Sequence, residues 1–196
     1  MRKFLFIPAI ISLLFACNSF STHKTLADSL HVADTALKHL SPQRLIVPGK
    51  SIGTIMINGN ADSLTMLLGK PNFSDASMGA AYMSWYIKHK KTVYQVNIYS
   101  HRNMGAADEA INHIKMIRVT SPWYKTADYA GAGSMLKDVK KLYRLKRHPS
   151  IGSNKLWMYD DYNAGIAFEV DSTQRCVSVL VHAKGDSTVS YINMHQ

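Results

Sequence analysis

Nine histidines and ten methionines are the residues of this chain that could bind a metal ion. Metal sites bring such ligands together at short, regular spacings, as in His-x-His, His-x-x-x-His or His-Glu-x-x-His. None of these spacings occurs here, and the methionines form no cluster along the sequence. His31 and His39 are eight residues apart, about two turns from one another on a helix. The sequence therefore predicts no metal site and no cofactor.

The residues that could act as acids, bases or nucleophiles also lack the required spacing. Asp160 and Asp161 are adjacent in a predicted turn, whereas glycoside hydrolysis needs two carboxyl groups facing each other across a cleft. The chain has no Ser-x-x-Lys motif with its companion motifs and no Cys-His signature around Cys176. The stretch 131–134 lacks the Lys of a phosphate-binding loop, so capping of the following helix explains it better. We expect a protein that is not an enzyme.

A basic cluster is the most distinctive surface feature that the sequence predicts. Its residues lie on, or just after, a helix expected from position 135 to about 145. The candidate residues for binding an anionic surface are Lys137, Lys140, Lys141, Arg144 and Arg147. Basic residues near an anionic surface contribute about 1 kcal/mol each, within a reach of about 8 Å at physiological salt. The cluster is interpreted either as a solvated outer face or as a docking site for anionic lipid or an acidic partner.

Two adjacent aromatic residues, Trp123 and Tyr124, fall in a predicted loop between the two halves of the chain. Aromatic residues are typical anchors of protein interfaces. Another interpretation is that this loop closes over its own core. Trp85, Tyr86 and Trp157 fall in predicted strands and are interpreted as sheet core. Trp123 and Tyr124 are therefore the candidate protein-binding residues.

The first seventeen residues have the pattern of an export signal. Met1 to Lys3 is basic, and Phe4 to Phe15 is an apolar run shorter than the about 20 residues of a membrane-spanning helix. The run ends in Leu14-Phe15-Ala16-Cys17, which resembles the bacterial lipobox. This resemblance implies that residues 1–16 are a lipoprotein signal peptide and that the thiol of Cys17 carries a lipid. Ordinary secretion and a cytoplasmic protein with an apolar N-terminus are the alternatives.

The net charge bears on the class of partner. The chain carries +10, and removal of residues 1–16 would take away Arg2 and Lys3 and leave +8. An exported basic protein meets anionic lipid headgroups, acidic glycans or acidic protein surfaces rather than nucleic acid. We therefore expect no nucleic-acid partner.

Cys176 lies in an alternating apolar run and is expected to be a buried free thiol.

Hydrophobic periodicity predicts the elements that position these residues. Residues 17–44 form a polar tether with a possible amphipathic helix. Residues 45–120 form a first unit, with a short helix or turn over 51–57, a helix over 61–68 and strands over 81–89, 92–100 and 111–120. Residues 121–196 form a second unit, with the basic helix and strands over 155–159, 165–170 and 176–182. The predicted fold class is α+β, with two similar units, each a helix or helix-loop-helix packed on a three- to four-stranded antiparallel sheet.

Two series of loop and helix-end residues carry a family resemblance. They are Pro48-Gly49-Lys50-Ser51-Ile52-Gly53, Leu67-Leu68-Gly69-Lys70-Pro71 and Trp85-Tyr86, followed by Val119-Thr120-Ser121-Pro122, Gly133-Ser134, Asp138-Val139 and Leu142-Tyr143. Together with the lipobox, they resemble tandem-repeat bacterial envelope lipoproteins of the β-lactamase-inhibitor-like and SmpA/OmlA-like group, over about residues 45–182. Arg144 stands where the second helix of that group usually stops at a Gly. The resemblance implies a role in binding proteins or stabilising envelope complexes, and it implies no catalytic residues.

These expectations define a lipid-anchored cell-envelope protein that acts as a non-enzymatic protein-binding or scaffolding module. The alternatives are a binder of anionic lipid, glycan or a small ligand through the basic helix, and an uncharacterised envelope enzyme. Asn18 follows the lipidated Cys in place of Asp, which by analogy with enterobacterial sorting favours the outer membrane, facing the periplasm. The expected partners are an envelope protein and, through the lipid anchor, the membrane.

Overall fold

The structure is a computed structural model that describes residues 40–87, 94–148, 156–187 and 192–195. The predicted signal peptide, the predicted lipidation site Cys17 and nearly all of the predicted tether lie outside the described residues.

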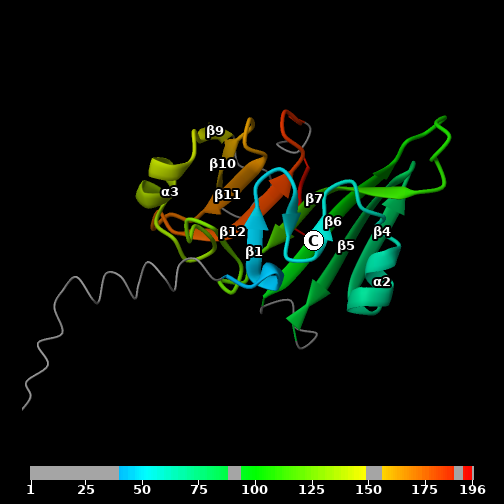
Figure 1. The fold of residues 1–196 in the computed structure, drawn as a ribbon, viewed down its shortest axis with the longest axis horizontal. Helices are drawn as coiled ribbons and strands as arrows, with labels where there is room; N and C mark the ends of the chain where they lie inside the picture. The colour runs from blue at the N-terminus through cyan, green and yellow to red at the C-terminus, as the bar shows by residue number, and fades with distance from the viewer. Residues whose placement is uncertain (1–39, 88–93, 149–155, 188–191, 196) are drawn as a thin grey trace, which may run out of the picture.

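Most of the described strand residues belong to one antiparallel sheet of eight strands (Figure 1). Its strands are β4 (Phe73–Ser77), β5 (Ala80–Tyr86), β6 (Gln95–Arg102), β7 (Asn112–Val119), β9 (Lys146–His148), β10 (Trp157–Asp161), β11 (Ile166–Val170) and β12 (Cys176–His182). Their order across the sheet is β4-β5-β6-β7-β12-β11-β10-β9. Each half of the chain therefore forms a meander of four strands, and the last strands of the two meanders pair with each other.

The pairing of β7 with β12 follows from the burial of both strands. Most of their side chains are buried on both faces of the sheet, and Ile117 lies directly opposite Val181 across the seam. A strand covered on both faces would leave its edge N–H and C=O groups unpaired and away from water unless another strand supplied partners. Pairing of the two final strands satisfies both edges at once.

A smaller sheet and two helices lie against the large sheet. The small sheet has the order β3-β2-β1-β8 and is built from β1 (Leu45–Val47), β2 (Ser51–Ile52), β3 (Ile55–Met56) and β8 (Lys125–Thr126), with a 3-10 helix at Pro42–Arg44 before it. The helices are α2 (Ser63–Leu68) and α3 (Leu136–Leu142). Figure 1 shows α2 near one end of the large sheet and α3 near the other, with the small sheet between them.

The main hydrophobic core lies between these elements and one face of the large sheet. Ile46 and Ile52 come from the small sheet, Leu136 and Val139 from α3, and Phe168 from β11, and all of them are buried. Each such side chain contributes about 1.5–3 kcal/mol by leaving water. This core fixes the position of the small sheet and its loops relative to the large sheet.

The opposite face of the large sheet is covered in part by the C-terminal residues 192–195. Met194 is buried there in a second apolar cluster. The phenol of Tyr82 donates a hydrogen bond to the carbonyl oxygen of Met194 at 2.8 Å. Nε2 of His195 lies 2.6 Å from Oε1 of Glu169. The C-terminal segment is therefore anchored to two different strands of the sheet, β5 and β11.

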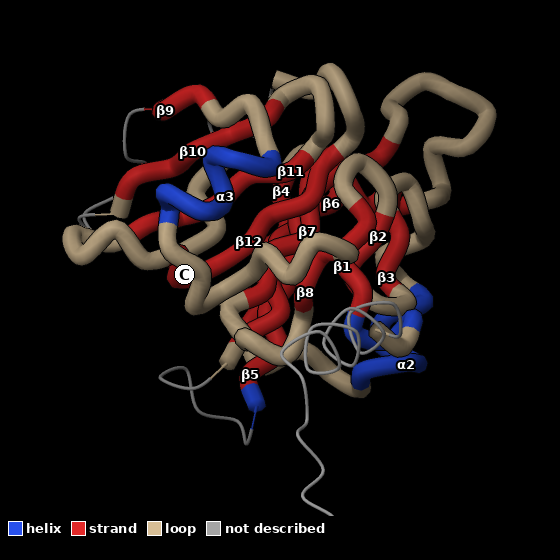
Figure 2. The backbone as a smooth tube through the Cα atoms, turned by 60° about the vertical axis from the view of Figure 1, so that its left-hand side comes forward, coloured by secondary structure: helices blue, strands red, loops and turns tan. Residues whose placement is uncertain are grey.

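The predicted α+β fold class is wrong. Among the described residues the protein is mainly β, with sheets of eight and four strands and two α-helices of six and seven residues (Figure 2). A helix followed by antiparallel strands does occur twice along the chain, but the two sets of strands form one sheet rather than two small ones. The physical reason is the pairing of β7 with β12, which are far apart in the sequence. Local hydrophobic periodicity cannot predict which strands pair.

Several local predictions also need correction. A short helix or turn was expected over 51–57, and this segment forms the β2–β3 hairpin, with a turn at 53–54 and no helix. Strand β4 was not expected, because most of its side chains are exposed. The basic helix ends at Leu142 rather than near 145. Within α2, Leu64 is buried, whereas Leu67 and Leu68 are exposed. The exposure of these two leucines bears on the candidate site.

Candidate functional site

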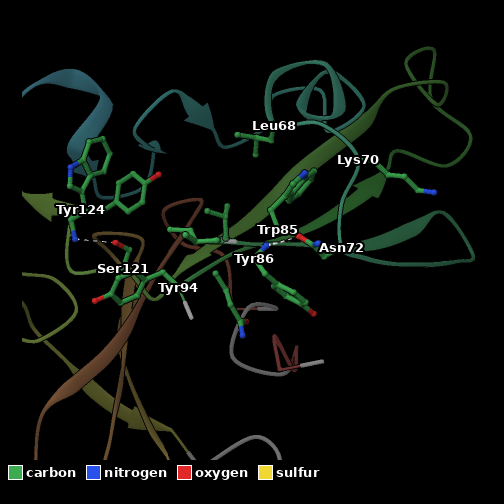
Figure 3. A pocket seen from close by; sticks show the side chains of 12 residues that line it. Leu68, Lys70, Asn72, Trp85, Tyr86, Tyr94, Ser121 and Tyr124 are labelled. Carbon is green, nitrogen blue, oxygen red and sulfur yellow. Dashed lines mark hydrogen bonds between the residues drawn. The ribbon is translucent and has the colours of Figure 1, made fainter. Parts of the chain in front are cut away.

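A cavity of about 510 Å³ opens between the end of α2, the adjoining ends of β5 and β6, and the loop after β7. Its lining residues are Leu68, Lys70, Asn72, Trp85, Tyr86, Ile87, Tyr94, Gln95, Val96, Ser121, Trp123 and Tyr124. Figure 3 shows Tyr124 on one side of it, Trp85 on the other and Leu68 above. Lys70 is the one charged residue among these described lining residues, and its side chain extends away from Trp85. This volume is typical of ligand pockets, which span about 300–1,000 Å³.

One wall of this aromatic cavity is fixed by the end of strand β5. The indole of Trp85 donates a hydrogen bond from Nε1 to the carbonyl oxygen of Gly69 at 2.8 Å. Gly69 ends α2 with a φ of +76°, a left-handed conformation that favours glycine. The backbone N–H of Tyr86 donates to Oδ1 of Asn72 at 2.8 Å. The turn after α2 therefore holds the aromatic end of β5 in place.

The other wall is the predicted aromatic loop, which follows β7. The rings of Trp123 and Tyr124 meet edge to face, with centroids 5.0 Å apart and an interplanar angle of 86°. The guanidinium of Arg44 lies 5.3 Å from the centre of the Trp123 ring, and its Nε donates to the Trp123 carbonyl at 3.2 Å. Burial raises the pKa of Tyr124. The two candidate protein-binding residues are thus ordered by the segment that enters the small sheet.

Apolar surface continues outside the cavity. Trp123 is 46% exposed, Ile87 48% and Leu68 38%. Met66 and Leu67, which precede Leu68 on α2, are exposed as well. Contiguous exposed apolar surface of this kind marks protein or membrane interaction sites, ligand grooves or aggregation-prone regions.

Aromatic, aliphatic and neutral polar side chains dominate the lining of the cavity. No histidine, cysteine or carboxylate is among the described residues that line it. Within the described ranges no three His, Cys, Asp or Glu side chains are grouped to hold a metal ion. No described helix is both long and apolar enough to cross a bilayer. The arrangement can bury an apolar group between aromatic walls and orient it with a few neutral polar groups.

The structure distributes the predicted anionic-surface residues over several environments. Lys137, Lys140 and Lys141 lie on α3, whereas Arg144 follows the helix and Arg147 lies on β9. Nζ of Lys140 is 5.0 Å from the centre of the Tyr159 ring, and Lys141 pairs with Asp138 at 2.7 Å. The guanidinium of Arg147 lies 5.2 Å from the centre of the Trp157 ring. Arg144 lines a separate polar cavity.

The predicted buried free thiol is confirmed. Cys176 is a free cysteine and is 1% exposed. Burial raises the pKa of its thiol to about 11, so the nucleophilic thiolate is scarce near neutral pH.

Sequence reasoning missed the role of Trp85 and Tyr86, which were assigned to the sheet core. Trp85 is buried and does pack in the core, yet its ring also forms a wall of the cavity. The available signal was their position near the end of the strand predicted over 81–89. Aromatic residues at a strand end face the loops of neighbouring elements, and Trp123 belongs to such a loop.

Comparisons with known proteins add little to this geometry. No protein-family model and no curated protein matches the chain. Among solved structures, an extracellular protein containing a SCP domain from Bacillus anthracis str. Ames aligns with 15% sequence identity and a TM-score of 0.40. The alignment covers 66% of this chain and 44% of that chain, so the protein spans less than half the length of that structure. A likeness this weak carries no argument about fold or function.

Proposed function

We propose that this protein is a non-enzymatic binding module of the cell envelope, and that its aromatic cavity receives an apolar segment of a partner protein. One observation carries the proposal. The cavity of about 510 Å³ has Trp123 and Tyr124 on one wall and Trp85 and Tyr86 on the other. Tryptophan and tyrosine are enriched among the residues that dominate binding energy at protein interfaces.

The chemistry of the lining indicates the chemistry of the partner. Lys70 is its one charged described lining residue and extends away from Trp85, so the cavity would leave a charged group beside the aromatic rings without compensation and away from water. An aliphatic or aromatic side chain would instead replace water against the rings. Exposed Met66 and Leu67 extend the apolar surface along α2, which suits a polypeptide segment that continues beyond its anchor residue.

Anchoring in the envelope is part of this proposal and rests on residues 1–17. A basic start, an apolar run and Leu14-Phe15-Ala16-Cys17 support export and lipidation, with the outer membrane as the destination. The test is the mass of the mature N-terminus, compared with that of a Cys17→Ser variant. A diacylated N-terminal Cys17 supports anchoring, whereas an unmodified residue at this position contradicts it.

The binding role is tested with random peptides displayed on phage and selected on the full chain. The affinity of the most enriched peptide is then measured by fluorescence anisotropy for the wild type and for Trp123→Ala. We expect the selected peptides to share an apolar or aromatic anchor. Loss of the Trp123 ring should weaken binding by at least about tenfold, because truncation of an interface hot spot costs about 2 kcal/mol or more.

Tyr162→Ala is the matched control, because Tyr162 is 43% exposed and lies outside the aromatic cavity. This variant should bind the selected peptide as the wild type does. Equal loss of affinity in both variants, or selected peptides without an apolar anchor, would contradict the proposal. Binding to phosphatidylethanolamine and phosphatidylglycerol vesicles that depends on Trp123 would identify a membrane surface as the occupant instead.

A further inference from the structure

A second cavity, of about 490 Å³, lies at the opposite edge of the large sheet, beside strand β9. Its lining is polar, in contrast to that of the aromatic cavity. The lining residues are Arg144, Lys146, His148, Asp160, Asp161, Tyr162, Asn163 and Ser187. We call it the polar cavity.

Basic side chains line the polar cavity along β9. Lys146 and His148 are two residues apart on this strand and share one face, and Arg144 precedes the strand. Arg147 belongs to the other face, where its guanidinium lies over the ring of Trp157. Within the described part of the chain, the side chains of Arg144 and Lys146 form no salt bridge.

The carboxylate of Asp161 is turned toward the backbone. Its Oδ2 accepts a hydrogen bond from the N–H of Arg144 at 2.7 Å, and its Oδ1 accepts one from the N–H of Ala164 at 3.0 Å. Asp161 is 7% exposed. This carboxylate therefore holds the two ends of the cavity wall together, and both of its oxygens already accept hydrogen bonds from the backbone.

Asp160 is held by a buried histidine. Its Oδ1 lies 3.0 Å from Nε2 of His182, and Nδ1 of the same ring lies 2.9 Å from the carbonyl oxygen of Ala183. Oδ2 of Asp160 lies 3.8 Å from Nε2 of His148.

The wall formed by the β10–β11 turn is rigid before any ligand arrives. The N–H of Gly165 donates to the carbonyl of Asp161 at 2.8 Å, and the N–H of Gly49 donates to the carbonyl of Gly165 at 3.0 Å. The N–H of Gly185 donates to the carbonyl of Tyr162 at 2.9 Å. Gly165 has a φ of +75°, and a Cβ there would lie 2.5 Å from the carbonyl oxygen of His182. A preformed wall lowers the entropy that binding must overcome.

We propose that the polar cavity binds a small molecule through a phosphate group. Both carboxylates already have partners within the protein, whereas Arg144 and Lys146 are exposed and are the cations of the lining that a ligand can meet. A phosphate dianion matches two cations, and a guanidinium can bind two of its oxygens at once. The site is concave, and Lys137, Lys140 and Lys141 are absent from its lining, so it fits a small molecule better than a flat anionic membrane. This site is independent of the aromatic cavity.

The test is isothermal titration calorimetry of the full-length protein with inorganic phosphate and with glycerol 3-phosphate, in a phosphate-free buffer at low ionic strength. We expect saturable binding with one site. The double variant Arg144→Gln/Lys146→Gln should weaken it by at least about tenfold, since it removes both charge-assisted contacts. Glutamine at position 144 keeps the backbone N–H that donates a hydrogen bond to Asp161. The variant should therefore keep the wild-type unfolding temperature.

The matched control is Lys137→Gln/Lys141→Gln, which loses the same charge from α3 and leaves the polar cavity unchanged. It should alter the affinity less than about twofold, the size of a screened long-range effect. Equal weakening in both double variants, or titrations that never saturate, would overturn the proposal. A second arm uses phosphatidylglycerol vesicles. Binding to these vesicles without binding to glycerol 3-phosphate would also overturn it, because the phosphate would then belong to a lipid headgroup.

Discussion

Arg118 and Glu169 form a buried ion pair that bridges the two halves of the large sheet. Nε and Nη2 of Arg118 each lie 2.8 Å from Oε2 of Glu169, and both residues are 4% exposed. Arg118 belongs to β7 and Glu169 to β11, so the contact passes over β12, which runs between them. Ser178, on β12, donates its hydroxyl to the same carboxylate oxygen. The pair therefore links the two meanders across their seam.

Polar side chains extend this contact across three further positions. Nη1 of Arg118 donates to Oδ1 of Asn97 at 2.8 Å, and Nδ2 of Asn97 donates to Oγ of Ser84 at 2.7 Å. At the other end, His195 reaches Oε1 of Glu169. A buried charge pair costs less when hydrogen bonds satisfy the remaining polar atoms, and this network does so.

Replacement of Arg118 by Met should destabilise the protein by about 3–5 kcal/mol, because it leaves the Glu169 carboxylate buried without its cation. The free energy of unfolding is measured by urea denaturation monitored by circular dichroism. The control is Arg118→Met/Glu169→Leu, which removes both charges and should lose less stability than the single variant. A single variant within about 1 kcal/mol of the wild type would show that the pair does not hold the halves together.

Acid should weaken the protein through Glu169. Burial alone would raise the pKa of this carboxyl, but the hydrogen bond from His195 and the charge of Arg118 outweigh it and lower the pKa to about 2. Because the folded-state pKa lies below the unfolded value of 4.5, the stabilisation is complete above about pH 4.5 and is lost as the pH falls toward 2. The shift corresponds to about 3 kcal/mol.

This acid dependence is measured as the free energy of unfolding between pH 6 and pH 2. Glu169→Gln should flatten the curve in this range, since glutamine does not titrate. His195→Ala should move the loss of stability to higher pH, because the pKa of Glu169 then rises. An unchanged pH profile in Glu169→Gln would assign the acid sensitivity to other carboxyls.

Cys176 should resist thiol reagents in the folded protein. Burial raises the pKa of its thiol to about 11, and the side chain is 1% exposed, so both access and thiolate are limited at pH 8. Labelling of the peptide that contains Cys176 is followed by mass spectrometry with iodoacetamide, with and without urea. Modification should require unfolding. Rapid labelling without denaturant would contradict the burial of this thiol.

Trp123→Ala should lower stability by no more than about 1 kcal/mol. The ring is half exposed, and its main contacts are the Arg44 guanidinium and the edge of Tyr124. Cation–π contacts at exposed sites contribute about 0.5–1 kcal/mol. Thermal unfolding of the purified variant checks this value. A much larger loss would mean that Trp123 serves the fold, and its effect on binding would then have to be judged from Tyr94→Ala.

Local alternation of apolar side chains was sufficient to predict some of the strands. The alternation over 92–100 and 176–182 predicted strands, and β6 and β12 occupy these segments. β4 was missed because four of its five side chains are exposed and leave no apolar pattern. Arg118 lies between Ile117 and Val119 in a predicted strand, a charge within an apolar run that signals a buried partner. Nothing local identifies Glu169 as that partner, because the contact depends on the pairing of β7 with β12.

The candidate site was predictable only in part, because its two walls come from elements that are far apart in the sequence. Trp123 and Tyr124 were identified because aromatic residues in a loop are conspicuous. Their opposite wall, Trp85 and Tyr86, lies in another element, and only the folded chain brings the two pairs around one cavity. Most of the basic cluster, including Arg144, was expected on one helix, but the helix ends at Leu142, and Arg144 lines the polar cavity instead.

Site-specific photo-crosslinking tests the aromatic cavity most directly. Benzoylphenylalanine replaces Tyr94, a 43% exposed lining residue, in the full chain within its own cells, and Tyr162 is the control position. We predict a crosslink from position 94 to an apolar segment of one partner protein, absent at position 162 and lost when Trp123→Ala is added. Crosslinks that persist in Trp123→Ala, or that reach only lipid, would contradict the account.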